Sequence, residues 1–137
     1  MNTITVSVVV NATKALAWNF FTSTAHIVNW NFASPDWECP TAENDLKVGG
    51  KFKSRMQAKD GSAGFDFEGV YRDVVEGSSY TYALEDGRTV RVSFEEVAGG
   101  TEVTETFDPE TENSEELQRV GWQAILENYK RYIEAVG

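Results

Sequence analysis

The chain has 137 residues, 41% of them hydrophobic and 12% aromatic, and its formal net charge is −10 at pH 7. We expect one domain, residues 1–137, with enough apolar side chains to form a hydrophobic core. The acidic balance argues against a nucleic-acid partner, because binding to phosphates needs clustered Lys and Arg, and it disfavours an anionic membrane surface.

The cysteine content and the N-terminal residues bear on the location of the protein. Cys39 is the only cysteine, so no intrachain disulfide can form and nothing indicates an oxidising compartment. Residues 1–18 lack the basic start and the continuous apolar block of a signal peptide. No apolar run approaches the length that crosses a membrane. We therefore expect a cytoplasmic protein without membrane insertion.

The first part of the chain predicts a strand followed by two helices. Residues 4–10 place Ile or Val at every second position, which is typical of a strand. Asn11 or Thr13 then offers a side-chain oxygen that can cap a helix running to Phe21. A second short helix is expected over about residues 24–30.

The central part of the chain predicts an antiparallel meander. Pro35 and Pro40 bracket a brief extended segment, and residues 47–50 form a turn. From there, Asp-Gly, Glu-Gly and Gly-Gly pairs indicate turns between short strands. The predicted strands are residues 50–59, 64–75, 78–84, 88–97 and 101–108.

The last stretch, residues 114–137, predicts one long helix. Ser114 is a suitable N-cap, and Glu115 and Glu116 in the first turn complement the helix dipole. The apolar side chains that cover well over half of the helix are Leu117, Val120, Ala124, Ile125, Leu126, Tyr129, Tyr132, Ile133 and Val136. We expect the sheet to wrap most of this helix and to leave a pocket between the two. The predicted fold class is α+β, with helices on one face of a single antiparallel sheet.

Strand alternation assigns one apolar face to each strand, and these faces are expected to look at the terminal helix. Trp30 and Trp37 flank Pro35, where they either line the pocket or pack in the core. The residues predicted to line a ligand-binding cavity are Trp30, Trp37, Phe52, Met56, Phe65, Phe67, Tyr80, Tyr82, Val92, Glu105, Gln118, Trp122, Ile125 and Tyr129.

Four polar residues fall on the predicted apolar faces. Glu105 and Ser54 lie in the inward register of their strands, and Gln118 and Asn128 lie near the apolar side of the long helix. Burying such groups is costly unless each finds a partner. For Glu105 three interpretations remain open: a bulge that returns it to solvent, a partner within the protein, or contact with a ligand.

The sequence lacks the residues that several kinds of catalytic or metal site require. His26 is the only histidine, which excludes a histidine-built metal site, and Cys39 with His26 cannot complete a closed zinc site. A Cys-His nucleophilic pair is conceivable, but a surface histidine and a small buried thiol explain both residues. The acidic residues at 110–116 are explained by helix capping. We predict no catalytic residues, no metal and no cofactor, and the motifs of nucleotide-binding loops are absent from the sequence.

Short motifs spread over nearly the whole chain carry a family resemblance. They are residues 12–21; His26, Val28 and Trp30; Asp45, Leu46, Val48, Gly49, Gly50 and Phe52; Asp60 and Gly61; Phe67, Gly69 and Tyr71; Asp86, Gly87 and Arg88; Thr101, Val103, Thr104 and Phe107; and Gly121, Trp122, Ile125, Leu126, Asn128 and Tyr129. In these motifs the chain resembles the START-like (SRPBCC) superfamily, in the branch similar to the C-terminal domain of the activator of heat-shock protein 90 ATPase. The resemblance implies a helix-grip fold, in which a curved antiparallel sheet with two short helices after its first strand grips a long C-terminal helix around a cavity.

Three functions follow as hypotheses. The first is non-enzymatic binding of a small hydrophobic or amphipathic molecule, such as a lipid, by a monomer or weak homodimer. The second is a stress-related, co-chaperone-like interaction with a chaperone or another protein, which rests on the resemblance and the acidic surface. The third is a cyclase- or hydrolase-like enzyme with Glu105 as general acid or base.

Overall fold

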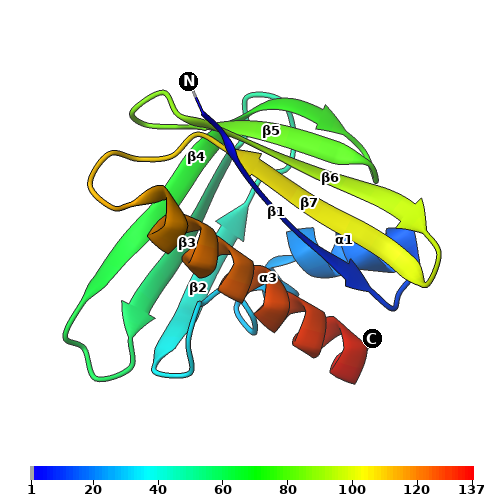
Figure 1. Cartoon of the computed structure of the whole chain (residues 1–137), viewed down its shortest axis with the longest axis horizontal. Helices are drawn as coiled ribbons and strands as arrows, with labels where there is room; N and C mark the ends of the chain where they lie inside the picture. The colour runs from blue at the N-terminus through cyan, green and yellow to red at the C-terminus, as the bar shows by residue number, and fades with distance from the viewer. Residues whose placement is uncertain (1) are drawn as a thin grey trace.

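The computed structural model describes residues 2–137, which form one curled antiparallel sheet and three helices (Figure 1). The strands are β1 (Ile4–Val10), β2 (Trp37–Asn44), β3 (Lys51–Ala58), β4 (Gly64–Val75), β5 (Ser79–Leu84), β6 (Thr89–Val97) and β7 (Gly100–Phe107). The helices are α1 (Lys14–Thr22), α2 (Thr24–Ile27) and α3 (Glu115–Val136). The strand order is β1-β7-β6-β5-β4-β3-β2, so β1 and β2 are the two edges. This confirms the α+β helix-grip architecture.

The predicted meander is confirmed, with one clear difference at β2. The sequence predicted only a brief extended segment between Pro35 and Pro40, whereas β2 continues past Pro40 to Asn44. The pairing of β2 with β3 shifts between Glu38 and Thr41, which places Pro40 in the irregular part of the strand. A proline cannot donate to a strand ladder, but an edge strand with a bulge tolerates it.

Helix α2 ends at Ile27, three residues before the predicted end at Trp30. The Trp30 indole Nε1 donates to the carbonyl oxygen of Phe20 at 3.0 Å. The Trp30 carbonyl accepts from Asn128 Nδ2 of α3 at 2.9 Å. These two bonds tie Trp30 to α1 and α3 after α2 has ended, and the chain then crosses to the sheet.

Both longer helices begin at the caps that the sequence offers. Thr13 Oγ1 accepts from the backbone N–H of Leu16 at 3.2 Å, and Ser114 Oγ accepts from that of Leu117 at 3.1 Å. Each cap satisfies one of the amides that a helix leaves free at its start. Of the two caps considered for the first helix, the structure therefore uses Thr13.

Helix α3 closes the free edge of β1. Gln123 Nε2 donates to the Ser7 carbonyl at 3.0 Å, and the Lys130 ammonium donates to the Val9 carbonyl. An edge strand exposes unpaired carbonyls that can pair with other chains. The polar stripe of α3 thus satisfies backbone groups of the sheet, and only its apolar side faces inward.

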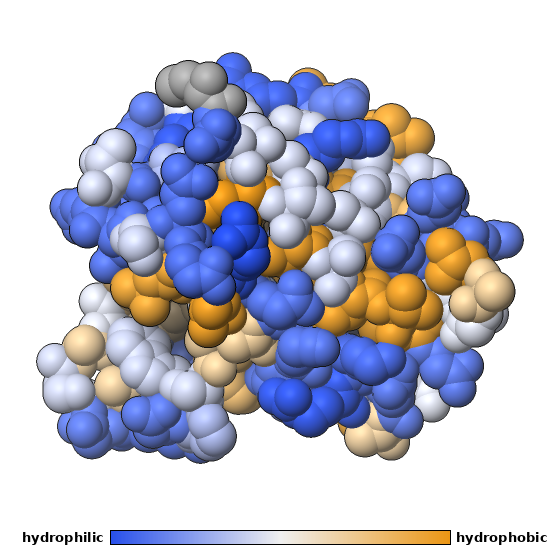
Figure 2. Space-filling view, in the orientation of Figure 1, coloured by the Kyte–Doolittle hydropathy of each residue, from blue (hydrophilic) through white to orange (hydrophobic). Residues whose placement is uncertain are grey.

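The sheet grips one face of α3 and leaves part of the apolar surface of the helix exposed. Leu117, Val120 and Val136 are 59%, 56% and 59% exposed. The sheet is open on one side, and α3 lies across that opening with a single face against the core (Figure 1). Figure 2 shows a mainly hydrophilic surface, on which apolar side chains form separate groups.

An aromatic cluster closes one end of the space between sheet and helix. Phe21 stacks on Trp30 with ring centroids 4.8 Å apart, and Tyr129 of α3 meets both rings edge-on at 4.9 and 5.2 Å. The Tyr129 hydroxyl donates to the Ala17 carbonyl at 2.8 Å. These contacts join α1, α3 and the loop after α2. None of the helices in residues 2–137 is long and apolar enough to cross a membrane.

Candidate functional site

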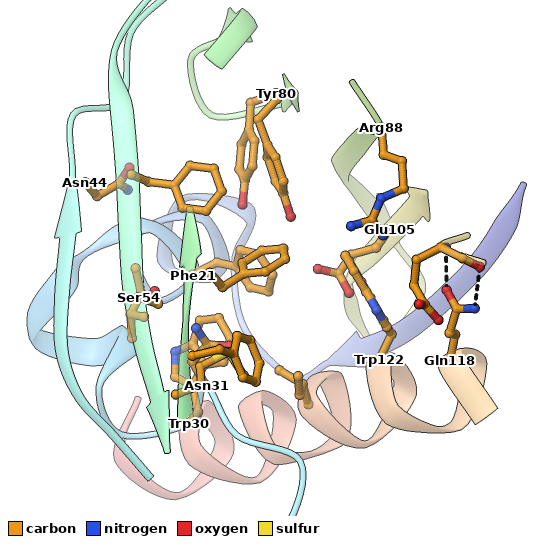
Figure 3. A pocket seen from close by; sticks show the side chains of 18 of the residues that line it. Phe21, Trp30, Asn31, Asn44, Ser54, Tyr80, Arg88, Glu105, Gln118 and Trp122 are labelled. Carbon is orange, nitrogen blue, oxygen red and sulfur yellow. Dashed lines mark hydrogen bonds between the residues drawn. The ribbon is translucent and has the colours of Figure 1, made fainter. Parts of the chain in front are cut away.

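A cavity of about 550 Å³ lies between α3 and strands β3, β4 and β5 (Figure 3). The apolar part of its walls is mainly aromatic, and the aromatic side chains come from both sides of the space. Phe52, Phe67 and Tyr82 lie on the sheet side, whereas Trp122 comes from α3 and Phe21 from α1. Volumes of about 300 to 1,000 Å³ with apolar walls are usual for small-molecule sites.

Gly69 on β4 makes room for an aromatic side chain of the cavity wall, Phe52 on the neighbouring strand β3. A Cβ at this position would lie 2.8 Å from Phe52 Cε2 and 2.8 Å from the Ala83 carbonyl oxygen. Because Gly69 has no Cβ, the Phe52 ring lies over the β4 backbone and meets Tyr82 edge-on at 4.6 Å. A glycine inside a strand is typical where another group approaches the backbone closely.

Strand register places Glu105 and Tyr80 on the same wall. Glu105 on β7 is paired with Val92 on β6, and Val92 is paired with Tyr80 on β5. Side chains directly opposite across strands share a face of the sheet. Glu105 is only 8% exposed, so the bulge that would have returned it to solvent is absent from β7.

The Glu105 carboxyl group points into the cavity without a partner from residues 2–137 (Figure 3). Burial alone raises its pKa from the ordinary 4.5 to about 8. At neutral pH the group therefore carries a proton, which it can donate in a hydrogen bond or to a reacting group. The hydroxyls of Tyr80 and Tyr82 have no described hydrogen-bond partner either, and burial raises both pKa values well above 10.

These unpaired oxygens face open volume and are not sealed in the core. Every fully enclosed side-chain nitrogen or oxygen within residues 2–137 has a hydrogen-bond partner. Glu105, Tyr80 and Tyr82 all line the cavity. Their unused hydrogen-bonding capacity is therefore available to a molecule inside it.

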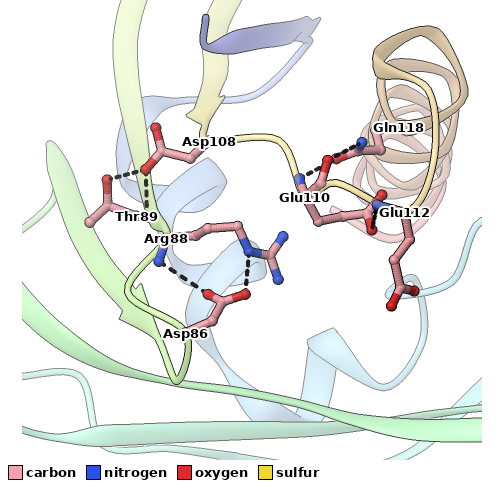
Figure 4. A network of polar contacts seen from close by, with 7 residues as sticks. All are labelled: Asp86, Arg88, Thr89, Asp108, Glu110, Glu112 and Gln118. Carbon is pink, nitrogen blue, oxygen red and sulfur yellow. Dashed lines mark hydrogen bonds and ion pairs between the residues drawn. The ribbon is translucent and has the colours of Figure 1, made fainter. Parts of the chain in front are cut away.

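The two polar residues near the apolar side of the long helix, Gln118 and Asn128, have partners within the protein. Gln118 Oε1 accepts from the Glu110 backbone N–H at 2.9 Å, and Gln118 Nε2 donates to the Asn113 carbonyl at 2.9 Å (Figure 4). Asn128 Nδ2 donates to the Trp30 carbonyl, as described above. Both amides hold loops against α3, so their hydrogen bonds are already made.

Charged groups surround the mouth of the cavity (Figure 4). Arg88 Nε donates to Asp86 Oδ2 at 2.7 Å, which leaves this cation already paired. Glu110 accepts from the backbone N–H groups of Glu112 and Asn113 at 2.9 and 2.8 Å, and these bonds hold the pKa of the Glu110 carboxyl below its ordinary value against the effect of burial. The acidic segment before α3 thus acts partly as a backbone cap.

The structure brings most of the predicted cavity residues together. Those that line the cavity are Trp30, Phe52, Met56, Phe65, Phe67, Tyr80, Tyr82, Glu105, Gln118, Trp122 and Ile125. Trp37, Val92 and Tyr129 do not line it. Whether the eleven bind a ligand stays a prediction.

The three exceptions have separate structural reasons. Trp37 lies at the start of the edge strand β2, where its ring meets Phe65 at 6.2 Å. Val92 is 1% exposed, because the longer Glu105 and Tyr80 side chains on either side reach past it. Tyr129 is fully buried, and its hydroxyl donates to a backbone carbonyl of α1.

Sequence reasoning missed part of the lining. Ser54 and Tyr71 had the inward register, and that signal alone could have added them to the predicted set. The other missed residues come from α1, α2, the start of the loop after them, the end of β2 and the loops at the mouth: Phe21, Ile27, Asn31, Glu43, Asn44, Arg88, Glu110, Glu112 and Asn113. Loops carry no periodic pattern, so only the fold shows which loop residues line the cavity.

His26 and Cys39 have different partners, which weakens the idea of a nucleophilic pair. His26 Nδ1 lies 2.8 Å from the Tyr132 hydroxyl, and its ring stacks on Phe20 at 3.8 Å. Cys39 is 2% exposed, and burial raises the pKa of its thiol. A raised pKa keeps the thiol protonated and poorly nucleophilic.

Comparisons with known proteins agree with this architecture. An AHSA1-like protein of Aeromonas hydrophila, solved in solution, is 42% identical, with a TM-score of 0.93 over 99% of this chain and 94% of that one. A protein of Cytophaga hutchinsonii is 46% identical, with a TM-score of 0.80 over 97% and 91%. A protein of Nitrosomonas europaea shares the fold at 18% identity, with a TM-score of 0.84 over 98% and 96%.

No curated protein matches the chain. The family described as "Activator of Hsp90 ATPase homolog 1-like protein" matches residues 11–134, which include all the strands after β1, helices α1 and α2, and all but the last two residues of α3. The START-like resemblance is thereby confirmed. The chain belongs to the family of activator of Hsp90 ATPase homolog 1-like proteins.

Proposed function

We propose that the protein binds a small hydrophobic or amphipathic molecule in the cavity between the sheet and α3, without converting it chemically. The observation that carries this proposal is a half-enclosed volume of about 550 Å³ whose aromatic walls surround polar groups without partners. Apolar walls supply affinity, and a few fixed polar groups supply orientation. Glu105, Tyr80 and Tyr82 are those groups.

A neutral fluorescent probe tests the proposal. N-phenyl-1-naphthylamine becomes brighter when it leaves water for an apolar site, so its titration reports occupancy of the cavity. Ser54 lines the cavity and is 6% exposed, and Ser54→Phe would fill part of the volume. We expect this variant to bind the probe at least about tenfold more weakly, because overpacking removes the space.

Ser93→Phe is the matched control. Ser93 lies between Val92 and Phe94, which are both buried, so its own side chain faces away from the cavity. It carries the same substitution on the outer face of β6. Circular dichroism checks that both variants fold. Equal probe binding by wild type and a folded Ser54→Phe variant, or no binding by wild type, would contradict the proposal.

Family membership supports a second candidate, an interaction with an Hsp90-type chaperone. Leu117 and Val120 leave apolar surface on the first turns of α3, outside the cavity. A double Leu117→Ser, Val120→Ser variant separates the two candidates, because it changes the surface and leaves the cavity lining intact. If the second candidate holds, the wild-type protein changes the ATP hydrolysis rate of the chaperone and the double variant does not. An unchanged rate with wild type would remove this candidate.

A further inference from the structure

We propose that the ligand carries a positively charged amine, which pairs with the carboxylate of Glu105 at the inner wall of the cavity. This inference rests on the proposed ligand-binding function and names the chemical class of the ligand. Four features of the structure carry it: the unpaired carboxyl group, the aromatic walls, the charge at the mouth and the coupling of binding to a proton.

The first feature is the position of Glu105. The residue is 8% exposed, it is held in the middle of β7 between β1 and β6, and its carboxyl group points into the cavity (Figure 3). Its strand neighbours on this face are Val6 and Val92, which offer no hydrogen bond. A buried carboxyl group is costly unless a partner compensates it. The described residues supply none, so a ligand is the remaining source.

The second feature is the aromatic lining. Tyr80, Tyr82 and Trp122 line the same volume as Glu105. The faces of such rings attract cations, and aromatic walls bind ammonium groups in this way. An ammonium group near Glu105 would therefore have a carboxylate as its partner and rings as its surroundings, while the apolar part of the ligand fills the rest of the cavity.

The third feature is the balance of charge along the entrance. Besides Glu105, the lining includes three acidic side chains, Glu43, Glu110 and Glu112, but only one cation, Arg88. Arg88 is already paired with Asp86 at 2.7 Å. An anionic ligand would meet more negative than positive charge, whereas a cation is attracted. The lining therefore favours an amine over a fatty acid or another carboxylate.

The fourth feature is the proton on Glu105, which the carboxyl group must release when an amine binds. At pH 7 the empty cavity holds Glu105 in its protonated form, since burial raises its pKa to about 8. Pairing with an ammonium group requires the carboxylate, so the carboxyl proton passes to the solvent as the amine binds. Because this release costs less at higher pH, amine binding strengthens from pH 6 to pH 8 and then levels off.

The neighbouring groups do not produce this pH dependence. The charged and titratable groups on the surrounding elements are Tyr129 on α3, Tyr71 on β4, Tyr80 and Tyr82 on β5, Glu43 on β2, and Arg88, Glu110 and Glu112 at the mouth. Burial raises the pKa of the four tyrosines above 10, and backbone hydrogen bonds lower that of Glu110. The four tyrosines therefore stay protonated, and Glu110 stays ionised, between pH 6 and pH 8.

Three matched probes test the inference: naphthylethylamine, naphthylethanol and naphthylacetate, all substituted at the same ring position. Calorimetric titration at pH 8 gives their affinities. We expect the amine to bind at least about tenfold more tightly than the alcohol, and the acetate to bind most weakly. The amine affinity should rise about fiftyfold between pH 6 and pH 8, because the ionised fraction of Glu105 rises by that factor. The alcohol affinity should stay level.

Two variants assign the effect to one carboxyl group. Glu105→Gln keeps the shape of the side chain and should remove both the preference for the amine and its pH dependence. Glu102→Gln makes the same substitution on the opposite face of β7 and should leave both unchanged.

The possible outcomes separate this inference from the proposed function. If the alcohol or the acetate binds as tightly as the amine, the inference is wrong while ligand binding stands. The same conclusion follows if Glu105→Gln retains the amine preference. If none of the three probes nor N-phenyl-1-naphthylamine binds, both proposals are wrong.

Discussion

The two ends of the space between sheet and helix use the same residue types to opposite effect. At the α1 end, Trp30 and Tyr129 pack against Phe21, and their polar atoms donate to backbone carbonyls at 3.0 and 2.8 Å. At the β3–β5 end, Tyr80 and Tyr82 are as deeply buried, yet their hydroxyls have no described partner and face a cavity.

The difference comes from the helices and not from composition. Helix α1 lies against β6 and β7, and α3 lies along β1, so backbone carbonyls of α1 are within reach of the core tyrosine and tryptophan. Strands β3 to β5 contribute to the cavity wall, where no helix backbone among the described residues offers such acceptors to Tyr80 and Tyr82. Aromatic residues therefore form a packed core at one end and the walls of a cavity at the other.

Truncating one aromatic residue at each end should show the largest contrast. Tyr129→Ala removes a fully buried ring that joins α1 to α3, and we expect the free energy of unfolding to fall by about 3 to 5 kcal/mol. Phe67→Ala removes a half-buried ring that borders space already open, and should cost about half as much or less. Urea unfolding measures both. Equal losses would mean that the cavity end is packed as tightly as the core.

The cavity end should also show a distinctive pH dependence of stability. The folded pKa of Glu105, about 8, exceeds the ordinary 4.5 expected when unfolded, so its contribution is fully present below pH 4.5 and is lost as pH rises through 8. The shift sets a ceiling of about 5 kcal/mol, and we expect about 2 to 3 kcal/mol because the cavity is open to solvent. Glu105→Gln should therefore be the more stable protein at pH 9.

The check is the difference between the two unfolding free energies, measured from pH 5 to pH 9. It should grow up to about pH 8 and then stay constant. Taking the difference removes the titration of all other groups. A difference that does not vary with pH would show that Glu105 is ionised and solvated in the folded protein, contrary to its placement in the cavity.

Gly69→Ala should disturb the cavity wall and spare the packed end. The new methyl group would press on the Phe52 ring and the Ala83 carbonyl at 2.8 Å, so we expect a loss of about 1 to 3 kcal/mol and weaker probe binding. Gly121→Ala on α3 is the control, since its Cβ meets nothing within 4 Å and should stabilise the helix by about 0.5 to 1 kcal/mol. Effects of the same sign would contradict this account.

Removing single hydroxyl groups gives the smallest and most specific comparison. Tyr129→Phe leaves the Ala17 carbonyl without its buried donor and should cost about 1 kcal/mol. Tyr82→Phe breaks no described hydrogen bond and should change the unfolding free energy by less than about 0.5 kcal/mol. If Tyr82→Phe costs as much as Tyr129→Phe, the Tyr82 hydroxyl has a partner within the protein.

Local patterns predicted the elements well, because each pattern reflects a local physical cause. Alternation and turn residues identified every strand except most of β2, Ser114 and one of the two candidate caps, Thr13, identified helix starts, and the inward register of Glu105 proved correct. The errors came where distant parts of the chain meet. The first turns of the long helix were expected to lie against the sheet, but Leu117 there is exposed, whereas the polar residue Gln123 bonds to the edge of β1.

The sequence by itself determined the order of the elements, the face on which each strand residue lies and the family of the protein. Only the tertiary structure decided which inward residues pack and which border a cavity. Tyr129 on α3 and Tyr82 on β5 both have inward positions in their local patterns, yet one meets the Ala17 carbonyl of α1 and the other faces open volume. Hydrogen-bond partners and empty space depend on segments about a hundred residues apart, such as α1 and α3, and periodicity in one segment carries no information about the other.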